Sequence, residues 1–214
     1  TPVNYVLPPG ISREQDPSQP QLVQSNEQAL AMTVHNLGYK ESKAVYKNTT
    51  LDIRQYKRLQ MFVHANALKP NVSNLADNQL AVFVRLGSDY KNNYYEYEIP
   101  LKLTPEGHYS NYTEEGRAAV WQADNMFDFP LEYFSNIKKQ RNRAKNSDQS
   151  ITLLKPYSQP SPGNQQHIVT IVGNPNLGEI DMMMIGVRNK AGSKRSAEVW
   201  VNELRLTDFD EDSG

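Results

Sequence analysis

Hydrophobic and polar residues alternate along several short stretches of the chain, a pattern typical of β-strands with one buried face. The alternation is clearest in residues 56–65, where Leu59, Met61 and Val63 share one face. The same pattern predicts further strands at residues 29–35, 45–51, 80–86, 94–103, 118–123 and 167–172. Strands therefore dominate the chain.

Residues 94–103 show which face of a strand is expected to be buried. Alternate side chains form two sets: Tyr95, Tyr97, Ile99 and Leu101 on one face, and Tyr94, Glu96 and Glu98 on the other. The first set is apolar, whereas the second carries two carboxylates. We therefore expect the first face to lie in the core and the second to face solvent.

The last long stretch, residues 173–206, contains two runs of strand length. It opens with a turn at residues 173–178, where glycine and proline favour tight backbone geometry. Apolar runs at residues 180–187 and 197–206 follow, separated by a polar break. Two such runs joined by a short glycine-containing loop predict a β-hairpin.

One stretch, residues 130–145, has the spacing of a helix. Leu131, Phe134 and Ile137 recur every three residues, and Asp128 is available as a cap. The second half is basic, with Lys138, Lys139, Arg141, Arg143 and Lys145. We interpret this cluster as a solvated helix end, where cations suit the helix dipole, rather than as a surface for nucleic acid.

About eight to ten strands, one helix and many turns predict an antiparallel β-sandwich of the jelly-roll type. Residues 1–28 are rich in Pro, Gln, Ser and Asn, so they are expected to form an extended arm or linker. Residues 29–207 would form the sandwich domain, and residues 208–214 an acidic linker.

The composition removes several classes of function. A formal charge of −1 gives no reason to expect nucleic acid or an anionic membrane as a partner. There is no cysteine, which excludes disulfides and thiolate metal sites. No stretch approaches the about 18 apolar residues of a membrane-spanning helix. The chain begins at Thr1 rather than Met, and we expect it to be a piece of a larger protein.

No catalytic motif is visible. The chain has neither a Gly-x-Ser-x-Gly elbow nor a phosphate-binding glycine loop. Four histidines lack the local spacing of metal ligands: His35, His64, His108 and His167. Glu96 and Glu98 lie roughly 7 Å apart on one strand face, and we interpret them as surface glutamates rather than an acid–base pair. We therefore expect a protein that is not an enzyme.

Two kinds of ligand remain candidates. Tyr90, Tyr94 and Trp121 are candidate sugar-stacking residues, because aromatic faces pack against pyranose rings. Tyr94 is the one expected to point outward. The alternating carboxylates of residues 208–214 are typical of a calcium loop, but the glycine falls at the seventh position instead of the sixth. No cofactor is expected there, and a structural calcium at the rim of the sandwich stays open.

Several blocks, in order along nearly the whole chain, resemble the SprA/Sov proteins of Bacteroidetes. The blocks are residues 5–14 (YVLPPGISRE), 56–65 (YKRLQMFVHA), 84–89 (VRLGSD), 94–97 (YYEY), 173–177 (GNPNL), 185–189 (IGVRN) and 199–206 (VWVNELRL). Members of this family are giant outer-membrane proteins of gliding motility and type IX secretion. The resemblance therefore implies a domain of a translocon whose membrane part is a very large β-barrel.

The same resemblance implies partners and a location. The partners would be other translocon subunits, the exported protein or the rest of the parent barrel. The location would be the cell envelope, associated with the outer membrane on its periplasmic or extracellular side. The family has no known catalytic residues, so none is carried over to this chain.

Residues 199–206 are also similar to the last strand of galactose-binding-like carbohydrate modules. Those modules carry Asp-Asn or Asp-Asp where this chain has Asn202-Glu203, in a region that helps to bind calcium. The difference argues against calcium here, and a shared fold does not imply sugar binding.

Two hypotheses follow. The leading one is a structural or partner-binding translocon domain, and the alternative is a carbohydrate-binding module of a cell-surface polysaccharide-processing protein.

Overall fold

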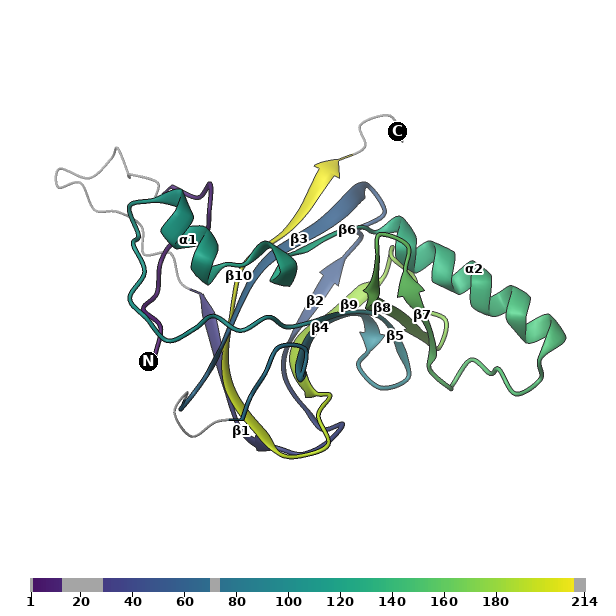
Figure 1. Ribbon diagram of the computed structural model, residues 1–214. Coiled ribbons are helices and arrows are strands. Elements are labelled where there is room, and N and C mark those ends of the chain that lie inside the picture. The colour runs from purple at the N-terminus through teal and green to yellow at the C-terminus, as the bar shows by residue number, and fades with distance from the viewer. Residues whose placement is uncertain (1, 13–28, 70–73, 210–214) are drawn as a thin grey trace.

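Ten strands form two antiparallel sheets in the computed structural model, which describes residues 2–12, 29–69 and 74–209 (Figure 1). The strands are β1 (Leu30–Leu37), β2 (Ser42–Leu51), β3 (Tyr56–Ala67), β4 (Leu80–Asp89), β5 (Asn93–Pro100), β6 (Phe127–Pro130), β7 (Tyr157–Ser161), β8 (Asn164–Val172), β9 (Ile180–Asn189) and β10 (Arg195–Phe209). The helices are α1 (Glu114–Val120), α2 (Glu132–Ser147) and the short 3-10 turn η1 (Ala123–Asn125). The narrower sheet has the order β1-β10-β3-β6, and the wider sheet β2-β9-β4-β5-β8-β7. The antiparallel β-sandwich is confirmed.

The core lies between the two sheets, where alternation places apolar side chains from both. On β3, Leu59, Met61 and Val63 point inward as predicted, and each is at most 1% exposed. On β5, Tyr97 stacks on Phe129 of β6, with ring centroids 3.8 Å apart. Each fully buried side chain of this kind contributes about 1.5–3 kcal/mol to stability, so the inner faces hold the two sheets together.

Helix α2 covers the part of the wider sheet that the narrower sheet does not reach. It lies against β7 and β8 (Figure 1), and Phe134 stacks on Tyr95 of β5 at 5.0 Å. Phe134 and Ile137 are buried, which confirms the predicted apolar stripe. The helix begins slightly later than predicted and has no side-chain cap. Asp128 does not cap it, because its carboxylate pairs with Arg58 of β3 at 2.7 Å.

The predicted hairpin at residues 173–206 is wrong. β9 pairs with β2 and β4 in the wider sheet, whereas β10 pairs with β1 and β3 in the narrower one. The loop between them carries the chain from one sheet to the other. Asn189 holds this crossing by donating hydrogen bonds from Nδ2 to the carbonyls of Leu37 and Ser193. The local sequence predicts that two strands form, but contacts with distant segments decide which strands each of them pairs with.

The strand predicted at residues 118–123 is also wrong, and a second helix takes its place. Thr113 caps α1, since its Oγ1 accepts a hydrogen bond from the Gly116 amide at 3.2 Å. Two glutamates in the first turn suit the helix dipole. The helix buries Val120 and Trp121 at its end. Periodicity cannot distinguish a strand from a helix in so short an apolar run. The sequence feature that indicates a helix here is Thr113, an N-cap residue.

Two short strands were not predicted. β6 and β7 each lie at an edge of their sheet, and each contains a proline, Pro130 and Pro160. Proline lacks the amide hydrogen that a central strand needs, and it is tolerated at an edge. Residues 155–166 are rich in proline and serine, and this composition is therefore compatible with an edge strand as well as with a loop.

Residues 2–12 lie along the outer face of the narrower sheet, beside α1 (Figure 1). Val3 and Val6 are fully buried and pack with Trp121 and Trp200 in a second apolar cluster. Trp121 Nε1 donates a hydrogen bond to the Val6 carbonyl at 2.8 Å. This arm therefore covers aromatic rings that would otherwise face water.

The backbone of the arm is bonded to α1 and to the loop before it. The Leu7 amide donates to Asn111 Oδ1 at 2.7 Å. Arg117 Nη1 donates to the Ile11 carbonyl at 3.0 Å. An extended segment cannot satisfy its own buried backbone groups, so these side chains supply the partners that a neighbouring strand would provide in a sheet.

The expected domain limits fall partly outside the described residues. The sandwich begins with β1 at Leu30, and β10 continues through Phe209. The last strand thus includes the first two residues of the expected acidic linker. Residues 13–28 of the expected arm and residues 210–214 lie outside the described part of the chain.

The packing of the arm predicts the effect of shortening one of its side chains. Val6→Ala should lower the free energy of unfolding by about 2 kcal/mol, because it removes two buried methyl groups and leaves a cavity beside Trp121. Chemical denaturation followed by tryptophan fluorescence measures the change. Ser12→Ala, at an exposed position of the same arm, is the matched control and should change stability by less than about 0.5 kcal/mol. Equal stability of the two variants would contradict a contribution of the Val6 side chain to the free energy of unfolding.

Candidate partner-binding surface

The outer face of the wider sheet carries alternating cations and carboxylates, named here the ion ladder: Arg85, Glu96, Arg188, Glu98 and Lys190. Arg85 Nε lies 2.5 Å from Glu96 Oε2, and Arg188 Nη1 lies 2.8 Å from Glu96 Oε1. Arg188 also pairs with Glu98, whose other oxygen lies 2.7 Å from Lys190 Nζ. Glu96 and Glu98 are 4% and 5% exposed. The prediction of solvated surface glutamates is wrong, because long cationic side chains lie over them.

The ion ladder keeps its central carboxylate ionised. Burial alone would raise the pKa of Glu96, but the hydrogen bonds and charges of Arg188 and Arg85 outweigh burial and hold the pKa below its usual value. Burial would likewise lower the pKa of Arg188, yet Glu96 and Glu98 raise it. Glu96 therefore stays ionised and paired with its two arginines near neutral pH.

Aromatic rings lie among the cations of the ion ladder. Arg188 and Arg85 lie 4.5 and 5.1 Å from the centroid of Phe83, and Arg85 lies 4.1 Å from that of Tyr94. Phe83 lies on Gly186, where a Cβ would come within 2.3 Å of the ring. Tyr94 is only 6% exposed. The expectation that the Tyr94 ring points into solvent is wrong, because the guanidinium of Arg85 covers the ring.

Tyr46 and Tyr90 form the open end of this face. Their rings stack with centroids 5.8 Å apart, and they are 59% and 39% exposed. Tyr46 lies on β2, an edge strand whose residues are exposed or half-buried throughout. Among the described residues, nothing pairs with the outer edge of β2. We call Tyr46, Tyr90 and the free edge of β2 the aromatic edge.

The three candidate sugar-stacking residues do not come together. Tyr90 and Tyr94 share the outer face of the wider sheet. Trp121 belongs to the cluster beneath the arm, on the outer face of the narrower sheet, and is 2% exposed. A single aromatic platform built from all three is therefore not present.

Tyr46 is the residue that sequence reasoning missed. Tyr46 of β2 is paired in register with Met184 of β9, and Met184 is paired in register with Arg85 of β4. Tyr46 reaches Tyr90 only because β2 and β4 both pair with β9. A sequence signal did exist. β2 contains Lys43 and Lys47 and no carboxylate, and lysines within a strand are typical of a sheet edge.

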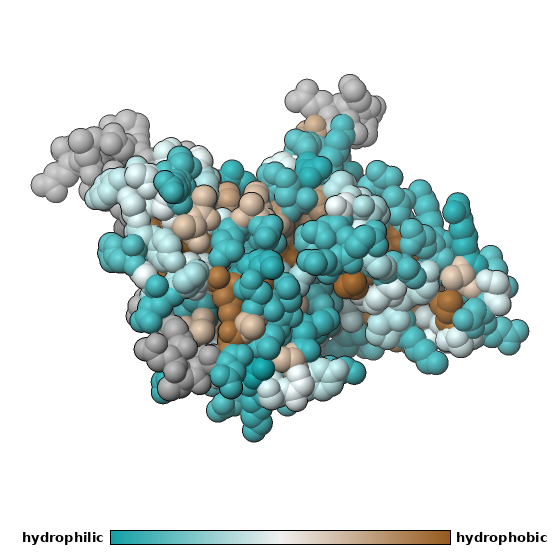
Figure 2. All heavy atoms as spheres, viewed as in Figure 1, coloured by the Kyte–Doolittle hydropathy of each residue, from teal (hydrophilic) through white to brown (hydrophobic). Residues whose placement is uncertain are grey.

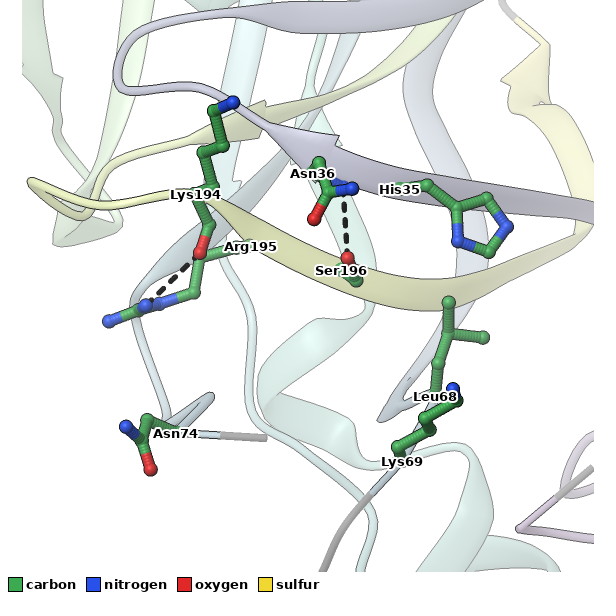
Figure 3. Close-up of a pocket in the computed structure, with 8 residues that line it drawn as sticks. All are labelled: His35, Asn36, Leu68, Lys69, Asn74, Lys194, Arg195 and Ser196. Atoms are coloured by element: carbon green, nitrogen blue, oxygen red, sulfur yellow. Dashed lines mark hydrogen bonds between the residues drawn. The ribbon is translucent and has the colours of Figure 1, made fainter. Parts of the chain in front are cut away.

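A separate open cavity of about 670 Å³ lies at one end of the narrower sheet (Figure 3). Its described lining is His35, Asn36, Leu68, Lys69, Asn74, Lys194, Arg195 and Ser196. Figure 3 shows Arg195 and Asn74 on one side, His35 and Leu68 on the other, and the Lys194 side chain pointing away. Because its cations do not converge on one point, we do not assign a ligand to this cavity.

The remaining surface offers few other candidates. The face seen in Figure 2 is mostly hydrophilic, and hydrophobic side chains show there only in small separate groups. Within residues 2–12, 29–69 and 74–209, no three histidine, aspartate or glutamate side chains are placed to hold a metal. No helix of the same ranges is long and apolar enough to cross a membrane.

Fold and surface together define a β-sandwich module with a stacked pair of exposed tyrosines at one sheet edge. The chain belongs to the SprA_N family of motility related/secretion proteins, whose model matches residues 1–214, the whole chain. The match confirms the resemblance seen in the sequence. No curated protein matches the chain.

The ion ladder predicts how stability depends on pH. The folded-state pKa of Glu96 lies below its unfolded value of about 4.3. Its ionised form therefore stabilises the fold fully above that pH, and the contribution is lost as the pH falls through the folded-state value. Glu96→Gln should cost about 3 kcal/mol at pH 7, because it leaves Arg188 and Arg85 partly unpaired, and less at pH 3.

Urea denaturation of the original chain and Glu96→Gln between pH 3 and 7 measures this difference. Glu106→Gln is the control, because Glu106 is exposed and forms no ion pair in the described part of the chain. A constant difference between the Glu96 variant and the original chain across this range would contradict the assignment of the acid dependence to Glu96.

Proposed function

We propose that this chain is a non-catalytic domain of an outer-membrane protein-export translocon that serves type IX secretion and gliding motility in Bacteroidetes. The observation that carries the proposal is the match of the whole chain to a motility related/secretion family. The blocks shared with SprA/Sov proteins support the finer assignment. The sandwich, which ends with β10 at Phe209, is structural or binds a partner in the cell envelope, with an arm before it.

The aromatic edge supports a partner-binding role. Tyrosines are enriched at protein interfaces, because their rings bury apolar area while the hydroxyl stays hydrogen-bonded. The free edge of β2 also offers backbone donors and acceptors to an extended segment of another chain. The partner would be another translocon subunit, the exported protein or the rest of the parent protein.

The aromatic edge can be tested in the intact parent protein. Tyr46→Ala combined with Tyr90→Ala should lower the amount of partner that co-purifies from outer membranes by about tenfold or more, as expected for an aromatic hot spot. Export should fall with it. Both are measured on tagged parent protein, by quantitative mass spectrometry and by the amount of secreted cargo.

Tyr112→Ala provides the matched control. Tyr112 is 97% exposed and lies before α1, away from β2, so its removal should change neither readout. Unchanged recovery and export in the double variant would remove the aromatic edge from the proposal. The same result after deletion of residues 29–207 would overturn the translocon role itself.

A carbohydrate-binding role is the second candidate, and the exposed stacked pair of Tyr46 and Tyr90 is the observation that favours it. A glycan array probed with the 214-residue chain separates the two roles. Saturable binding that Tyr90→Ala abolishes and Tyr112→Ala preserves would favour sugar recognition. Because Trp121 is buried, its replacement should affect stability before it affects any ligand.

A further inference from the structure

A second groove, of about 370 Å³, lies between α2 and the turn at residues 173–178. Lys138 and Lys139 line it from the helix, and Arg54 lines it from the loop between β2 and β3. No carboxylate is among its lining residues in the described part of the chain. The groove therefore joins the basic helix and the glycine-proline turn, two features that the sequence shows only separately.

The charge in the groove is not balanced by ion pairs. Arg54 is neutralised, because its Nη2 lies 2.6 Å from Asp52 Oδ2. Lys138 donates one hydrogen bond from Nζ to the Pro175 carbonyl at 2.8 Å, and its ammonium has three donors. Neither Lys138 nor Lys139 forms an ion pair within the described residues.

A buried cation behind the groove adds to the imbalance. Arg141, one turn along α2, is 0% exposed. Its Nη1 donates to the Gly173 carbonyl. Its Nη2 and Nε both donate to Asn142 Oδ1, at 3.1 and 3.3 Å. Both acceptors are neutral. No carboxylate pairs with it in the described part of the chain. A buried cation without a counter-ion is costly, and buried charges in proteins are normally paired.

The pKa shifts of Lys138 and Arg141 agree with this geometry. Burial lowers the pKa of Lys138, and the charge of Arg141 lowers it further. Burial also lowers the pKa of Arg141. An anion in the groove would act against both effects, since a nearby opposite charge favours the protonated form.

Neutral donors line the groove beside the cations. Because Asn142 Oδ1 accepts from Arg141, its Nδ2 is the atom left to donate to a ligand. Asn176 Oδ1 likewise accepts from the Gly178 amide at 3.0 Å, which leaves its Nδ2 as a donor. Ser135 adds a hydroxyl to the lining. Ammonium and amide donors around one space are the groups that hold oxyanions.

We propose that the groove between α2 and residues 173–178 binds an oxyanion, a phosphate, sulfate or carboxylate group of a ligand. Lys138 and Lys139 supply charge-assisted hydrogen bonds, Asn142 and Asn176 orient the oxygens, and Arg141 provides a fixed positive charge behind them. The site is independent of the translocon role proposed above, because its groups would bind the anion in any assembly.

The test titrates the 214-residue chain with inorganic phosphate, sulfate and succinate separately, at constant ionic strength set by chloride. Calorimetry or backbone amide shifts in NMR report binding. At least one of the three anions should bind saturably, and the preferred anion identifies the source of the oxyanion. Lys139→Gln should weaken that binding by about tenfold, the value of one charge-assisted hydrogen bond.

Lys145→Gln is the matched control. Lys145 is an exposed lysine of the same helix that does not line the groove, so its replacement should leave the affinity unchanged. Lys139 is exposed as well, so both variants should fold, and circular dichroism confirms this. Absence of saturable binding of all three anions, or an equal loss of affinity in the two variants, would overturn the proposal.

Discussion

Two sheets of unequal width must bury their inner faces against each other, and the rest of the structure follows from that constraint. The four-stranded sheet covers only part of the six-stranded one. Helix α2 covers the remainder by placing Phe134 on Tyr95. This packing brings the basic surface of α2 against the turn at residues 173–178. The oxyanion groove is thus a consequence of closing the core and not a separate addition to the fold.

The outer faces of the sheets are buried by two different means. The narrower sheet uses hydrophobic burial, because the arm places Val3 and Val6 over Trp121 and Trp200. The wider sheet uses charge, because the ion ladder and the ring of Phe83 lie over its central strands. Groups of this chain itself lie over the centre of each face. An interaction role is therefore best sought at edges and grooves, where side chains and backbone groups stay open.

The aromatic edge and the oxyanion groove differ in chemistry and in the element that builds them. The aromatic edge has exposed rings and a free strand edge, which suit another polypeptide. The groove has unbalanced cations and amide donors, which suit a charged group. The chain belongs to a motility related/secretion family, and substitutions on different elements can test the two surfaces separately.

Patterns within single segments were enough to identify most strands, the apolar stripe of α2 and the inward residues of β3, because alternation and helical spacing are local consequences of burial on one face. The family resemblance also came from the sequence alone. Three features depended on pairing between distant segments: the crossing of β9 and β10 between sheets, the stacking of Tyr46 on Tyr90, and the cations that bury Glu96 and Glu98. A glutamate at an alternating polar position looks solvated until its neighbours are known. Which strand lies beside it is a property of the whole fold, because the free energy of pairing is shared among residues far apart in the chain.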